Sequence, residues 1–198
     1  MCLVKRALIV AVLAALSIGP HAVAGTATGC RPLIKDPSGD ALEHYLPTKR
    51  NRADLDITSV SVTNDRSSLR LTTRVAHLAA PQPIGGIYSV FFRVHGFPYV
   101  AEAYRGLDET TFLLAVDNRF GDRPSWPIAG TVDQKTRSVT VVVPLALIGS
   151  PRAGARIDGI SAVSSESMGT STVAVVGRTD ETSQGHVSVL NRPACGSP

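Results

Sequence analysis

Short β-rich runs recur at intervals of about ten residues along this chain, and Gly, Pro, Asn and Asp separate them. Within several runs apolar and polar residues alternate, as in 69–75, where Arg70, Thr72 and Arg74 lie between apolar or β-branched residues. No window of helical length carries the 3.6-residue apolar stripe of an amphipathic helix. The pattern predicts an all-β fold, an antiparallel β-sandwich of jelly-roll or immunoglobulin-like type with about nine strands.

Three local features refine this prediction. The apolar phase shifts at Thr58-Ser59, which indicates a β-bulge there. The run 88–94 is apolar on both faces apart from Ser89 and Arg93, so we expect a central strand. Residues 145–148 follow a proline and can form one helical turn, whereas 117–127 is expected to be a polar loop.

The first residues have the order of a secretory signal peptide. Lys5 and Arg6 precede an apolar run of about 12 residues, and Ala22-Val23-Ala24 forms an A-x-A cleavage site. This run is shorter than the roughly 20 residues that span a bilayer, although an uncleaved anchor is an alternative. We therefore expect a signal peptide over 1–24 and a secreted, extracellular protein with no membrane span in the mature form.

The remaining chain, 25–198, shows no repeat or long linker and is expected to form one domain. It contains two cysteines, Cys30 and Cys195, one near each end. In an oxidising compartment the simplest prediction is one disulfide between them. An alternative is lipidation of Cys30, because Ala27-Thr28-Gly29-Cys30 loosely resembles a bacterial lipobox.

Charge limits the classes of partner. The chain has a net charge of +4, and removal of Lys5 and Arg6 with the signal peptide leaves +2. This is too little for a protein whose main work is binding nucleic acid or an anionic membrane. Arg70 and Arg74 lie on one side of a predicted strand and suggest an anion-binding face, although a GC-rich coding bias equally explains the arginine content.

Acidic residues gather near the beginning of the predicted domain. In Asp36-Pro37-Ser38-Gly39-Asp40, two carboxylates flank a Pro and a Gly that can bend the backbone, so that both face one point. Asp54 and Asp56 follow, and we expect them on one strand face. Hard cations such as Ca²⁺ take six to eight oxygen ligands, which such residues can supply. The alternative is ordinary turn chemistry with solvated carboxylates.

The residues 36–41, the strand opening 55–57, the 69–71 strand and the later 141–145 segment together resemble secreted β-sandwich modules. The group they resemble is the DOMON and family 9 carbohydrate-binding-module-like superfamily, including small secreted actinobacterial proteins. The resemblance implies a jelly-roll-like sandwich that binds an extracellular sugar or other ligand. It also implies a structural calcium, with Asp36, Asp40 and Asp56 as the residues carried over.

A sugar-binding face needs exposed aromatic side chains. Trp126 is the first candidate, followed by Tyr99 and Tyr104; the alternative for Trp126 is a plug that covers the core from a loop. Nucleophile-elbow and zinc-protease motifs are absent from the sequence.

We therefore expect a non-catalytic module that binds carbohydrate or another extracellular ligand. One alternative is a structural or surface-interaction protein without a small-molecule ligand, whose partner would be a surface protein. Another is a hydrolase with an unrecognised site.

Overall fold

β2 (Ile57–Asn64) and β3 (Ser68–Val75) form an antiparallel hairpin. The turn that joins them, 65–67, lies where the alternation of apolar and polar residues is interrupted. The Asp65 carboxylate accepts hydrogen bonds from the backbone N–H groups of Ser67 and Ser68, each at 2.8 Å. Such side-chain acceptors stabilise tight turns.

The computed structural model describes residues 32–41, 51–78, 84–106, 109–117, 124–168, 174–182 and 188–189.

The hairpin belongs to the smaller of two antiparallel sheets. Its strand order is β1-β2-β3-β9-β8, with β1 at Ile34–Lys35, β9 at Ser138–Pro144 and β8 at Ala129–Asp133. Leu69, Leu71 and Val75 point inward, whereas Arg70 and Arg74 are exposed on the outer face. This sheet therefore has one face buried in the core and one face exposed to solvent.

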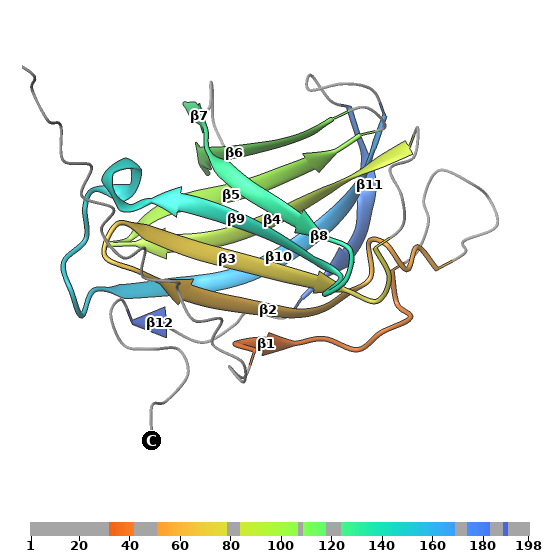
Figure 1. Ribbon diagram of the computed structural model, residues 1–198, viewed down its shortest axis with the longest axis horizontal. Helices are drawn as coiled ribbons and strands as arrows, with labels where there is room; N and C mark the ends of the chain where they lie inside the picture. Colours follow the sequence, from red (N-terminus) through yellow and green to blue (C-terminus); the bar gives the residue numbers. More distant parts are fainter. Residues whose placement is uncertain are drawn as a thin grey trace, which may run out of the picture.

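The larger sheet has the order β11-β10-β4-β5-β6-β7, and β12 (Ser188–Val189) also pairs with β10. The other strands are β4 (Ile84–Val94), β5 (Phe97–Arg105), β6 (Thr110–Val116), β7 (Ser125–Pro127), β10 (Arg156–Met168) and β11 (Ala174–Glu181). Figure 1 shows the two sheets packed face to face. One core cluster fills the space between them, with Tyr88, Phe92 and Leu114 from the larger sheet. The predicted antiparallel β-sandwich is confirmed.

The chain changes sheets between β7 and β8. β7 pairs with β6 in the larger sheet, and β8 pairs with β9 in the smaller one. A single residue, Ile128, separates the two strands, and its N–H donates to the Phe112 carbonyl at 3.0 Å. This crossing ties the two sheets together along one side of the sandwich (Figure 1).

Several local predictions are also confirmed. The ladder between β2 and β3 shifts register between Ile57 and Ser59, where the bulge was expected. β4 lies between β10 and β5, the central position expected for it, and Leu145–Ile148 forms a 3-10 helix. The described residues form twelve strands, because β1, β7 and β8 add to the nine expected. These three are only two to five residues long, too short for alternation to identify them; β7 also occupies the end of the expected loop 117–127.

The predicted signal peptide and both cysteines, Cys30 and Cys195, lie outside the described residues. β1 and β12, the first and last described strands, belong to different sheets. In the described part of the chain, no helix has the length and apolar character needed to cross a membrane.

Candidate metal centre

Four carboxylates from distant parts of the chain gather where β2 begins and β11 ends. Asp36 and Asp40 lie in the loop after β1, Asp56 precedes β2 by one residue, and Asp180 is the penultimate residue of β11. Asp36, Asp40 and Asp180 each have a carboxylate oxygen within 4.8 Å of the others. This separation is compatible with one shared ion, because two Ca²⁺ ligands at 2.3–2.6 Å on opposite sides are about 5 Å apart.

Asp56 connects this group to the turn that holds Asp40. Its side chain is only 1% exposed. Its Oδ2 accepts a hydrogen bond from the Gly39 N–H at 2.6 Å and a second from Asn51 Nδ2 at 3.3 Å. Gly39 has a φ of +98°, in the left-handed region that favours glycine. Gly39 thus bends the loop so that its own N–H and the flanking carboxylates face the same region.

Two oxygens of the group are buried without a hydrogen-bond partner. They are Asp36 Oδ2 and Asp56 Oδ1. A buried carboxylate oxygen left unpaired is costly, so such atoms usually face a donor, a water molecule or an ion. The lone pairs of these two oxygens are therefore available to coordinate a cation.

The electrostatics of the group agree with this assignment. The pKa of Asp36 is raised from 3.8 to about 6, first by burial and then by the charges of Asp180, Asp40 and Asp56. Burial also raises the pKa of Asp180, against an opposing hydrogen bond from the Ile57 N–H at 2.6 Å. Among the described residues, no cationic side chain forms an ion pair with any of the four carboxylates. The group is thus an anionic site whose charge the described protein leaves uncompensated.

Asp54 does not join this group. The Arg52 guanidinium holds its carboxylate by two hydrogen bonds of 2.9 and 2.8 Å, and also contacts the fully buried Glu166 at 3.0 Å. We expected Asp54 and Asp56 on one strand face, but residues 53–55 form a turn and β2 begins only at Ile57. The two-residue alternation of a strand therefore does not apply to this pair.

Asp180 was not expected from the sequence. It lies 123 residues from Ile57, whose N–H donates to its carboxylate. The available signal was an acidic residue continuing a β-rich run, which is too common to identify a ligand. Only the pairing of β10 with β11 and the packing of the two sheets place Asp180 beside the N-terminal loop.

The three candidate ligand-binding aromatic residues do not share a surface. Tyr99 stacks on Phe92 with ring centroids 5.6 Å apart and packs against the core. Trp126 is paired in register with the buried Leu114 and also packs against the core. Tyr104 lies on the outer face of the larger sheet, where its hydroxyl donates to Glu102 Oε2 at 3.0 Å.

Comparisons of the chain with models of known protein families, with curated proteins and with solved structures find no match.

Proposed function

We propose that this chain is a secreted, non-catalytic β-sandwich module that carries a structural Ca²⁺ at Asp36, Asp40, Asp56 and Asp180. The observation that supports it is the pair of partnerless buried oxygens, one on Asp36, within the group of three carboxylates Asp36, Asp40 and Asp180, and one on the neighbouring Asp56. All four ligands are oxygen donors, which suits a hard cation rather than Zn²⁺, whose usual ligands include nitrogen or sulfur.

The ion would attach the N-terminal segment to both sheets. Asp36 and Asp40 come from the segment next to β1, Asp56 from the start of β2 in the smaller sheet, and Asp180 from β11 in the larger sheet. The adjacent N-terminal segment buries few large side chains among its described residues, with Ile34 and Ala41 as its buried apolar residues. A cation that binds only the folded form would therefore stabilise both this segment and the whole sandwich.

Thermal unfolding in calcium and in chelator tests the metal centre. At a hundredfold excess of Ca²⁺ over its Kd, linkage gives about 2.7 kcal/mol. For a domain of this size, that corresponds to a melting temperature about 5–10 °C higher. Asp40→Asn should lose this calcium response, whereas Asp158→Asn, at an exposed carboxylate on β10, should keep it. Equal melting temperatures of the parent protein in calcium and in chelator would contradict the proposal.

The module would bind an extracellular carbohydrate or another extracellular ligand. The supporting features are the predicted signal peptide and Tyr104, an aromatic side chain on an outer sheet face. A second candidate, a surface-interaction protein without a small ligand, is favoured by the inward packing of Tyr99 and Trp126. A glycan array separates these two functions: binding to a defined glycan supports the first, and absence of binding to every glycan supports the second.

A further inference from the structure

Positive charge is concentrated on the outer face of the smaller sheet, although the net charge of the chain is small. This face and the two turns that border it, 65–67 and 134–137, form a surface that we call the basic face. Its exposed charged side chains are six cations, Lys35, Arg66, Arg70, Arg74, Lys135 and Arg137, and two carboxylates, Asp65 and Asp133. The basic face therefore carries +4, although the chain from residue 25 onward carries only +2. The rest of that chain is net negative, so the charges are segregated by the fold.

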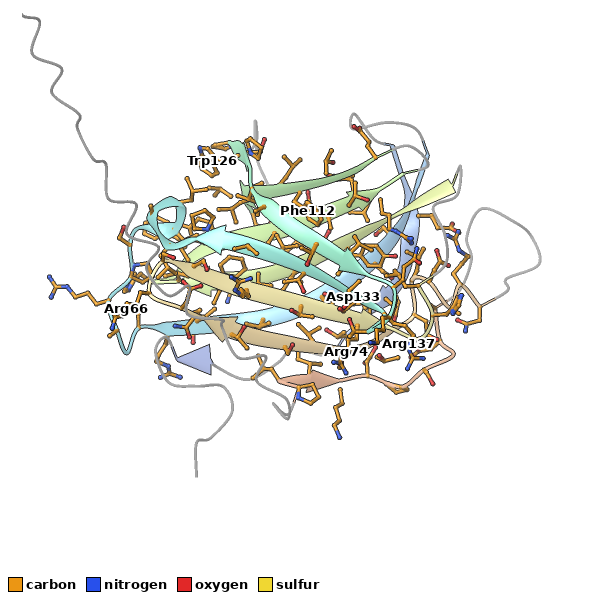
Figure 2. All side chains as sticks on the ribbon, viewed as in Figure 1. Arg66, Arg74, Phe112, Trp126, Asp133 and Arg137 are labelled. Atoms are coloured by element: carbon orange, nitrogen blue, oxygen red, sulfur yellow. The ribbon has the colours of Figure 1, made fainter. Side chains whose placement is uncertain are left out.

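The cations of the basic face lie at both ends of the sheet. Figure 2 shows Arg66 at one end and Arg74 with Arg137 at the other. Arg70 and Arg74 point outward from one strand, about 13 Å apart for four residues of 3.3 Å rise. Arg70 has only a 3.7 Å contact with Asp65, both being about half exposed, and Arg74 forms no ion pair with a described residue. These guanidinium groups remain available to an external anion.

A row of hydroxyl groups crosses the sheet between these charges. Ser61, Thr72, Thr140 and Thr131 are direct neighbours across β2, β3, β9 and β8. The hydroxyls of Thr72 and Thr140 are 2.9 Å apart and hydrogen-bonded, which fixes their positions. The basic face thus offers hydroxyl groups flanked by guanidinium groups, a combination that can bind a ligand carrying both hydroxyls and anions.

The described residues of the basic face lack the features that bind nucleic acid or an anionic lipid layer. None of them is aromatic, so nucleic-acid bases would find no stacking partner. Its outward apolar side chains on β8 and β9 are Ala129, Val142 and Pro144, which are too small to insert into a lipid layer as Trp, Phe or Leu do. An anionic polymer with hydroxyl groups along its length matches both the charge and the hydroxyl row.

We propose that the basic face binds an acidic polysaccharide, one that carries sulfate or carboxylate groups. This inference rests on the proposed function and names the substrate class and the surface. Arg70 and Arg74 bind the anionic groups, and the hydroxyl row between them binds sugar hydroxyls. The face that binds the polymer is then distinct from the outer face of the larger sheet, which holds Tyr104.

Binding of the secreted protein to immobilised heparin, with neutral dextran of similar size as the control, tests the proposal. The parent protein should bind heparin and not dextran, with affinity that falls as salt rises. Arg70→Gln/Arg74→Gln should weaken heparin binding about tenfold. The matched control is Arg93→Gln/Arg156→Gln, which removes the same charge from two exposed arginines outside the basic face.

Three outcomes overturn the inference. They are no heparin binding by the parent protein, equal weakening by both variant pairs, and equally strong binding to single-stranded DNA that Arg70→Gln/Arg74→Gln reduces by the same factor. If the parent binds a neutral glycan on the array but not heparin, the proposed module stands and this inference fails. If heparin binding depends on Arg70 and Arg74 while calcium leaves the melting temperature unchanged, the inference stands and the metal centre fails.

Discussion

Individual aspartates in this chain have opposite roles that their sequence contexts do not reveal. The pKa of Asp65 is lowered to about 2, chiefly by the hydrogen bond from the Ser67 N–H, because its carboxylate completes a turn. Asp36 has a raised pKa because burial and three neighbouring carboxylates oppose its charge. The first residue stabilises the fold when ionised, whereas the second destabilises it unless a cation binds.

The raised pKa of Asp36 predicts a pH dependence in chelator. Because its folded pKa is about 6 against 3.8 unfolded, its favourable contribution is complete below pH 3.8 and is lost as pH rises to about 6. Denaturant unfolding in chelator should therefore show stability falling over this window. The lowered pKa of Asp65 affects stability only below this window, because the contribution of its ionised carboxylate is lost as the pH falls from 3.8 to about 2.

Asp36→Asn is the control for this pH dependence, since it removes the titrating group and should flatten the slope. Excess Ca²⁺ should also flatten or reverse the slope, because the ion favours the charged form. A stability that is constant from pH 4 to pH 6 in chelator contradicts the prediction.

At the scale of elements, the turn at 53–55 is attached to the larger sheet by charged and polar contacts. Arg52 joins Asp54 to the buried Glu166 on β10, the Tyr88 hydroxyl donates to the Asp54 carbonyl at 2.8 Å, and Ser164 donates to the Leu55 carbonyl at 2.5 Å. These contacts position the beginning of β2. The same short segment thereby directs Asp54 toward Arg52 and Asp56 toward the candidate metal centre.

Arg52→Met should destabilise the protein by about 3 kcal/mol, because it removes a cationic partner of a fully buried carboxylate. Denaturant unfolding of the single and double variants measures this effect. Adding Glu166→Gln to Arg52→Met should restore part of the loss, since the buried charge is then absent. A cost below about 0.5 kcal/mol for Arg52→Met, typical of a surface pair, contradicts the prediction.

The crossing strand β8 approaches β6 closely at Gly130. A Cβ atom added to Gly130 would meet the ring of Phe112 at less than any ordinary contact distance. Gly130→Ala should therefore cost about 1–3 kcal/mol through overpacking. Ala129→Val, at the exposed neighbouring position, is the control and should change stability little. Equal unfolding free energies for Gly130→Ala and the parent protein would show that Phe112 moves aside freely.

For the whole molecule, the fold distributes charge unequally over its surface. Carboxylates concentrate where β2 begins and β11 ends, and cations concentrate on the basic face. The small net charge of the chain therefore conceals two regions of opposite sign. We propose a different partner for each region, a divalent cation for the first and an anionic polymer for the second.

The predicted disulfide between Cys30 and Cys195 also belongs to this scale, because it would close nearly the whole domain into one loop. On the chain-entropy model such a bond stabilises by up to about 5 kcal/mol. Thiol labelling of the denatured, unreduced secreted protein should find no reactive cysteine. Two labelled thiols would exclude the bond, and an intact mass showing lipid on Cys30 would exclude both the bond and Gly25 as the mature N-terminus.

The sequence alone determined the fold class and several of its details, because these depend on patterns a few residues long. Alternation over 69–75 identified β3 and its two faces, and the phase shift at Thr58-Ser59 identified the bulge. Inward and outward positions repeat every two residues, so a strand carries its own evidence of burial. The acidic loop also predicted Asp36 and Asp40, which the structure brings together.

Only the tertiary structure decided which distant residues share a site. Asp180 replaced Asp54 in the carboxylate group because sheet packing brings β11 to the beginning of β2, while a turn directs Asp54 to Arg52. Strand register likewise turned Trp126 toward Leu114 and the core, and it aligned the cations and hydroxyls of the basic face across four strands. A local pattern cannot specify these arrangements, since they arise from pairings between segments far apart in the chain.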